Sequence, residues 1–199
     1  KESLPKEPKQ NEYRNIILER DIPANSIYKA FHTCSRFDDE FYATELLTDI
    51  LCGSKSSLLY HTLVKEQQLF NSINAYFTGD LDNGLMVVEG KVNDGVEVKN
   101  ADHAVDVLLQ QVADDGVQEK EMKIVKQKTE SALIFSEVNI GNRALNLAYF
   151  EMIGGAEKIN KQLQQYEAVN SNDVQQVAKT ILKKENESSI YYCKKGVTL

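Results

Sequence analysis

The stretch from Asp38 to Phe77 limits the fold more than any other, because its hydrophobic pattern changes there from a helical to a strand period. Apolar residues recur at helical spacing between Phe41 and Leu51 and predict an amphipathic helix. The acidic residues at 38–40 are expected in its first turn, where the helix dipole favours negative charge. Gly53 follows the last apolar residue and is expected to end the helix.

The second half of this stretch combines a short polar turn, a helix and a strand. Either Ser56 or Ser57 is the expected cap of a helix that runs through Leu58 to Val64. From Ile73 to Phe77 apolar and polar residues alternate, which predicts a half-buried strand. A polar loop at 79–84 with two glycines then joins it to an apolar strand at 85–92, as in a hairpin.

The remaining periodicities predict strands on both sides of a block of helices. Strands are expected at 13–19, 26–33 and 189–193, and helices at 100–116, 118–135, 145–153, 159–166 and 171–181. Asn100 is the expected cap of the first of these helices. In the helix at 118–135, Met122, Val125, Ala132 and Phe135 are expected to point inward. This order predicts an α+β fold, with a single, mostly antiparallel sheet and helices packed on one face.

Charge and composition exclude several classes of protein. The chain has 199 residues, with 23 Lys and Arg against 30 Asp and Glu, and its net charge of −7 argues against nucleic-acid binding. No apolar run is long enough for a transmembrane helix. An odd number of cysteines, Cys34, Cys52 and Cys193, predicts free thiols rather than a disulfide framework. The compartment stays open between cytoplasm and periplasm, since the sequence starts at Lys1 rather than at a methionine.

Candidate catalytic and metal-binding groups are few. The histidines, His32, His61 and His103, have no second histidine at helical spacing, so no catalytic zinc site is expected in the chain. His32 and Cys34 invite comparison with a Cys/His nucleophile, but a structural role is favoured because no third orienting group is identifiable. For Ser56 and Ser57, a helix cap is favoured over a contact with peptide substrate.

Several motifs resemble the second half of the pitrilysin/insulinase-type zinc peptidases, in their processing-peptidase-like branch. That half carries a Gly-x-x-Ser-Ser-Arg-Leu turn and a helix that ends in Arg-Glu-x-x-Gly-Leu-x-Tyr. Here the turn reads Gly53 to Leu59, and the helix end reads Val64 to Asn71. Two further stretches, Gly116 to Lys126 and Ala168 to Val174, are similar to family motifs in the same order.

The resemblance implies a C-terminal, non-zinc-binding half. The Arg and Tyr that this half usually lends to the active site fall on Val64 and Asn71, and the Arg of the turn falls on Leu58. The chain is therefore expected to have no catalytic residues. Ser56, Ser57, Lys65 and Asn71 are its candidate contacts with substrate or partner.

The resemblance also implies partners. Residues 1–10 are expected to form an interdomain linker and residues 11–199 the C-terminal domain, so the chain would be a fragment that starts inside the linker. Zinc is expected in a missing N-terminal half, if the parent protein is active. The domain would form a wall of a chamber that encloses peptides, and would dock to that half or to a related subunit in a homo- or heterodimer. The alternatives are a stand-alone interaction domain and an inactive peptidase paralogue.

Overall fold

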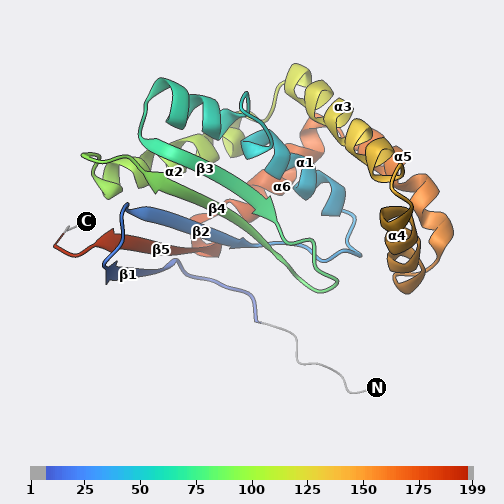
Figure 1. Cartoon of the computed structure of the whole chain (residues 1–199), viewed down its shortest axis with the longest axis horizontal. Coiled ribbons are helices and arrows are strands. Elements are labelled where there is room, and N and C mark those ends of the chain that lie inside the picture. The colour runs from blue at the N-terminus through green and yellow to red at the C-terminus, as the bar shows by residue number, and fades with distance from the viewer. Residues whose placement is uncertain (1–7, 197–199) are drawn as a thin grey trace.

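The computed structural model describes residues 8–196 and contains one five-stranded sheet with helices on one side (Figure 1). The strands are β1 (Arg14–Arg20), β2 (Ser26–His32), β3 (Phe70–Phe77), β4 (Leu85–Val92) and β5 (Glu187–Lys194). The α-helices are α1 (Phe41–Cys52), α2 (Val98–Asp115), α3 (Glu119–Ser136), α4 (Ile140–Met152), α5 (Gln162–Ala168) and α6 (Ser171–Ile181). Three shorter helices complete the set: η1 (Tyr60–Glu66), η2 (Ala156–Lys161) and η3 (Lys184–Asn186).

The strand order is β1-β5-β2-β4-β3, which confirms the predicted mostly antiparallel sheet. Only the pair of β1 and β5 is parallel, with Ile16 opposite Ile190. The predicted hairpin between β3 and β4 is present, and β4 lies inside the sheet between β2 and β3. In β2, Ile27, Lys29 and Phe31 point to the buried side, as strand alternation predicts.

The core lies between this sheet and helices α1, α2 and α6. Its least exposed members include Leu47 and Leu51 of α1, Met86 of β4 and Val174 of α6. Apolar residues on one stripe of each helix thus meet the apolar side of the strands, as an α+β fold requires. The opposite side of the sheet is more open, and Ile16 and Ile17 of the edge strand β1 are half exposed.

Several expected helix starts are corrected. Helix α1 begins at Phe41, so the acidic residues at 38–40 precede it instead of occupying its first turn. Helix α2 begins at Val98, which places Asn100 inside the helix rather than at its cap. Helix α3 begins where expected, and Gln118 and Glu121 form a capping box there.

The expected inward face of α3 is wrong in its second half. Met122 and Val125 are buried, but Ala132 and Phe135 are exposed, and Phe135 keeps 74% of its surface. Helix α3 packs on α1 and α5 with its first turns and then leaves the core (Figure 1). Helix α4 follows at the same end of the molecule, away from the sheet (Figure 1).

Candidate functional site

The turn that connects α1 to η1 contains Ser56 and Ser57. Ser57 occupies the predicted cap position, because the helical segment starts at Leu58 and the amide of His61 donates to the carbonyl oxygen of Ser57, but its hydroxyl turns back to the carbonyl oxygen of Ser54 instead of accepting a bond from the helix. The hydroxyls of Ser54 and Ser56 lie 3.0 Å apart. The serines therefore stabilise the turn itself, as hydroxyl side chains commonly do.

The same turn lines a small cavity against α3. Its volume is about 70 Å³, and Ser56, Ser57 and Lys128 are among its walls. The ammonium group of Lys128 donates to the carbonyl oxygen of Gly53 at 2.6 Å, and so satisfies the C-terminal end of α1. Because a water molecule occupies about 30 Å³, this space suits ordered water rather than a peptide side chain. A substrate contact at Ser56 or Ser57 stays a prediction.

The backbone from Tyr60 to Ser72 departs from regular geometry three times. Helix η1 is a π-helix, in which the amide of Gln67 donates to the carbonyl of Thr62 at 2.9 Å. Gln68 has a positive φ of 52°. Asn71 is the extra residue of a bulge, since Phe70 pairs with Val92 and Ser72 with Lys91. π-Helices and bulges are frequent at functional sites, which marks this segment as the candidate site.

The candidate contact residues Lys65 and Asn71 are both exposed on this irregular segment. The ammonium group of Lys65 lies 5.7 Å from the centre of the Tyr60 ring. Asn93 holds the turn, because its side-chain amide donates to the carbonyl of Gln68 at 2.6 Å. Val64 is partly buried against the core, so it offers no charge to a substrate. The segment thus has a fixed, irregular backbone with two polar side chains facing solvent.

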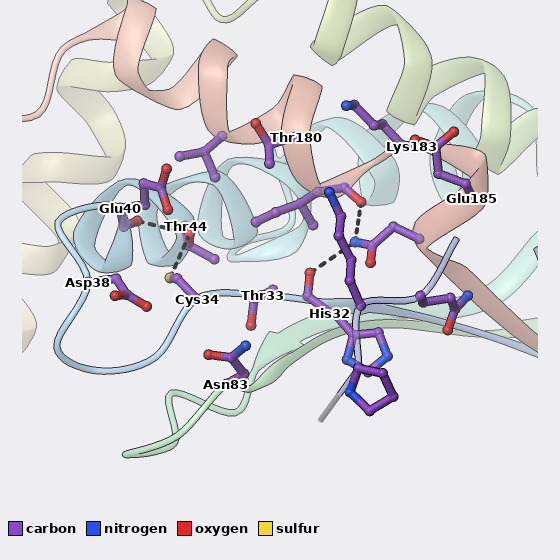
Figure 2. A pocket seen from close by; sticks show the side chains of 16 residues that line it. His32, Thr33, Cys34, Asp38, Glu40, Thr44, Asn83, Thr180, Lys183 and Glu185 are labelled. Carbon is purple, nitrogen blue, oxygen red and sulfur yellow. Dashed lines mark hydrogen bonds between the residues drawn. The ribbon is translucent and has the colours of Figure 1, made fainter. Parts of the chain in front are cut away.

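A second hollow, of about 370 Å³, is lined by His32, Cys34 and residues of α6 (Figure 2). Strand β2 ends at His32, and Cys34 lies beyond it with its thiol turned to the hydroxyl of Thr44 at 3.5 Å (Figure 2). Burial raises the pKa of Cys34 and so favours its protonated thiol form, which is less nucleophilic than the thiolate. No hydrogen bond joins His32 to Cys34 among residues 8–196, so the geometry offers no nucleophile-base pair.

Within residues 8–196, no group of three His, Cys, Asp or Glu side chains is arranged to hold a metal ion. The same part of the chain contains no helix long and apolar enough to cross a membrane.

The sequence patterns did not predict a buried charge cluster around Lys29 of β2. Lys29 is completely buried, and its ammonium group lies 2.7 Å from Asp102, 2.6 Å from Asp106 and 2.9 Å from Glu187. Burial alone would lower the pKa of Lys29, but the three carboxylates outweigh it and raise that pKa. The available signal was a lysine between Ile27 and Phe31 on the apolar side of a strand.

One family model matches more than half of the chain. Residues 1–129 match the family model described as the peptidase M16 inactive domain. No curated protein sequence matches the chain.

Solved structures share the fold at low sequence identity. One is a protease from Helicobacter pylori, with a TM-score of 0.88 and 17% identity over 96% of this chain and 47% of that chain. Another is the inactive peptidase domain of a candidate zinc protease from Bordetella parapertussis, with a TM-score of 0.78 and 19% identity over 88% of this chain and 96% of that one. A peptidase M16 inactive domain from Pseudomonas fluorescens has a TM-score of 0.83 and 13% identity over 98% of this chain and 47% of that chain. The chain therefore spans about half the length of the Helicobacter protease.

Proposed function

The chain belongs to the family of peptidase M16 inactive domains, and from this premise we propose that it is the docking and wall-forming half of a zinc-peptidase-like protein. The catalytic zinc would be held by an H-x-x-E-H helix in a partner half-domain, either in the same polypeptide or in a related subunit. This domain would close one side of a chamber that encloses peptides. Its own part in the reaction would be architectural.

Two features support an architectural role. Residues 8–196 contain no group arranged to hold a metal ion. The positions at which related half-domains carry a substrate-binding Arg and Tyr are Val64, which packs against the core, and Asn71, which is exposed in a bulge. Asn71 and Lys65 are the side chains that we propose to touch a peptide, since both face solvent on a backbone fixed by Asn93.

The observation that carries the docking proposal is an apolar surface on the protruding pair of helices. It consists of large side chains that keep between 39% and 86% of their surface, and we call it the α3–α4 surface: Ile134, Phe135, Val138, Ile140, Leu145, Leu147 and Met152. A typical monomer leaves few such contiguous patches, and the larger ones mark interaction sites.

Helix α4 gives a second reason to expect a partner. Its exposed apolar residues do not share one stripe, because Ile140 and Leu147 lie on one side of the helix and Leu145 and Met152 lie on another. Phe150 occupies a further side and is the buried residue of the helix. A helix that is apolar around most of its circumference is normally enclosed by protein. Here it packs mainly on η2, which leaves most of its surface uncovered.

Association of separately produced halves tests the proposal. The chain and the half-domain that precedes it in the full polypeptide would be mixed and studied by sedimentation velocity. We expect a one-to-one complex, and at least tenfold weaker association when Phe135 and Leu145 are both changed to Glu, because charge at the centre of an apolar interface is strongly unfavourable. The complex should cleave a fluorogenic peptide only with zinc bound.

The matched control is Gln111→Glu/Gln176→Glu, which adds the same two charges at exposed positions on α2 and α6. It should leave association unchanged. Full association of the Phe135→Glu/Leu145→Glu variant would refute docking through the α3–α4 surface. A complex without zinc-dependent cleavage would favour the alternative, an interaction domain or inactive paralogue.

A further inference from the structure

Arg36 is a buried cation held by aromatic rings instead of carboxylates. The residue is more than nine-tenths buried, at 8% exposure. The centre of its guanidinium lies 4.1 Å from the Phe41 ring centroid, 5.0 Å from that of Tyr42 and 5.8 Å from that of Phe150. These rings come from α1 and α4, so Arg36 joins the start of α1 to the protruding helix.

Few of the hydrogen-bond donors of this guanidinium have a protein partner. One side-chain nitrogen donates to the Tyr42 hydroxyl at 3.3 Å, and the Tyr149 hydroxyl is a second hydrogen-bonding neighbour of the guanidinium. Among the residues that the structure describes, no Asp or Glu oxygen lies within 4.0 Å of it. A guanidinium has five N–H donors in a planar fork. A buried cation without an anionic partner is unfavourable unless another group or water completes its shell.

The guanidinium lines an open cleft between α1, α3, α4 and α5. The volume of this cleft is about 380 Å³, in the range of sites for small ligands. Its walls combine the rings of Phe41, Tyr149 and Phe150 with the polar groups of Ser136, Asn146 and Gln162. Aromatic rings thus lie close to the guanidinium, and Arg36 also borders the open space of the cleft.

The two carboxylates that line the cleft, Glu45 and Asp49, are engaged by groups other than Arg36. Lys128 is paired with Asp49 at 3.3 Å, so these two charges offset each other. Glu45 accepts a hydrogen bond from the Tyr166 hydroxyl at 2.5 Å, and burial raises the pKa of its carboxyl group. Neither carboxylate lies within 4.0 Å of the Arg36 guanidinium, so this cation has no direct ion-pair partner in the cleft.

We propose that this cleft is a carboxylate-binding site, in which Arg36 holds the C-terminal carboxylate of a short peptide and the last side chain of the peptide lies against Tyr149 and Phe150. A planar carboxylate matches one guanidinium fork with two parallel hydrogen bonds. A phosphate dianion would bring a second charge that the cleft does not balance. The choice of a peptide rests on the proposed function, whereas the carboxylate site rests on the geometry of Arg36 alone.

Calorimetric titration of the 199-residue chain tests the site. The probes are acetyl-Ala-Phe with a free carboxylate, the same dipeptide as its C-terminal amide, and inorganic phosphate. We expect the acid to bind at least tenfold more tightly than the amide and than phosphate. Arg36→Lys should weaken binding of the acid about tenfold, since lysine keeps the charge but loses the bidentate geometry.

Two further variants distinguish weaker binding at the site from a loss of folding. Tyr149→Phe keeps the ring and removes a hydroxyl from the cleft wall, and Asn146→Leu replaces a polar wall by an apolar one of similar size. Each should weaken acid binding several-fold without a change in the circular-dichroism spectrum. Arg143→Met is the matched control, because Arg143 is an exposed arginine of α4 that pairs with Glu137 outside the cleft.

The outcomes separate this site from the docking proposal. Equal binding of acid and amide, tighter binding of phosphate, unchanged binding in Arg36→Lys or Tyr149→Phe, or no binding at 10 mM acid would each overturn the carboxylate site. Arg36→Lys should still associate with the partner half-domain in sedimentation. Failure of the unchanged chain to associate with the partner half-domain, with intact acid binding, would remove the docking proposal alone.

Discussion

At the scale of single residues, the ammonium group of Lys29 has the largest effect on stability that the structure predicts. It is buried among Asp102, Asp106 and Glu187, and Lys184 also pairs with Asp106 and Glu187 from the surface. Lys29→Met removes the central cation and leaves buried carboxylate charge uncompensated. We expect the free energy of unfolding to fall by about 3–5 kcal/mol, measured by urea denaturation.

The control for this change is Lys120→Met, which removes an exposed lysine from α3. Its effect should stay within about 0.5 kcal/mol. Addition of Glu187→Gln to Lys29→Met should recover part of the loss, because it removes one of the uncompensated charges. Equal stability of Lys29→Met and Lys120→Met would contradict the role of the cluster.

The cysteines are a second set of residues whose surroundings have a measurable consequence. Burial raises the pKa of the Cys52 thiol to about 11, and this thiol also donates to the carbonyl oxygen of Ile73 at 3.2 Å. Because the thiolate is the reactive form, alkylation of Cys52 by iodoacetamide at pH 8 should be roughly 100-fold slower than that of an unburied thiol. Mass spectrometry of the native and urea-unfolded chain would measure this ratio. Equal labelling rates would show that the site opens faster than it reacts.

At the scale of elements, β3 and β4 pack closely at Gly90, where the ring of Phe70 lies over the glycine. A Cβ atom at Gly90 would lie 2.6 Å from the ring of Phe70, which covers the glycine from the neighbouring strand. Gly90→Ala therefore forces the ring or the strand to move, and should lower the free energy of unfolding by about 1–3 kcal/mol. Thermal and urea unfolding would measure the loss.

A double-mutant cycle isolates the cause of that loss. Phe70→Leu shortens the side chain that meets the new methyl group, so Gly90→Ala should cost less in a Phe70→Leu background than in the wild type. Gly95→Ala is the matched control for packing, since nothing lies within 4 Å of a Cβ atom there, although its positive φ of 83° adds backbone strain. Additive effects of the Gly90 and Phe70 changes would rule out the steric explanation.

Local periodicity predicted most helices and strands correctly. It did not predict features that depend on residues far apart in the sequence. The alternation in β2, the apolar run of β4 and the apolar stripe of α1 depend on neighbours in sequence, and each is present. The parallel pairing of β1 with β5 joins opposite ends of the chain and left no local signal. Phe135 was expected inward because helical spacing gives only a direction, whereas α3 leaves the core before that residue.

In the candidate site, too, the sequence predicted local features but not those that depend on residues far apart in the chain. Sequence motifs indicated the segment from Ser56 to Asn71, including the loss of the usual Arg and Tyr at Val64 and Asn71. The π-helix and the bulge depend on the pairing of β3 with β4 and on Asn93, which a one-dimensional pattern does not contain. The cleft around Arg36 combines four helices, so no single stretch of sequence predicts it.

At the scale of the whole molecule, the buried core and the exposed apolar surface lie in different parts of the domain. The core is closed by α1, α2 and α6, whereas the α3–α4 surface and edge strand β1 keep apolar side chains exposed. The domain thus has enough buried core to fold, and a separate apolar surface that is most stable when covered. This arrangement is typical of a domain that works within a larger assembly.

The groups with perturbed pKa values predict how the whole domain responds to alkaline pH. Burial raises the pKa of Tyr166, whose hydroxyl also donates to Glu45, and the pKa of Tyr191 is raised by burial and by its bond to Tyr13. The pKa of Lys29 is raised as well, by its carboxylates. In each case the unfolded chain releases its proton at a lower pH than the folded chain. The stability that these groups contribute is therefore complete below about pH 10 and is lost as the pH rises further.

The expected result is a free energy of unfolding that is nearly constant up to about pH 8, begins to fall as the buried thiols Cys34, Cys52 and Cys193 ionise in the unfolded chain, and falls more steeply above pH 10. Each fully buried group contributes a slope of about 1.4 kcal/mol per pH unit at 25 °C. Tyr166→Phe removes one titrating hydroxyl, so its stability curve should be lower than that of the wild type at pH 8 and less steep above pH 10. Urea unfolding at each pH measures both properties. A Tyr166→Phe curve parallel to the wild-type curve would show that Tyr166 ionises as readily in the folded domain as in the unfolded chain, and that its contact with Glu45 does not withstand alkaline solution.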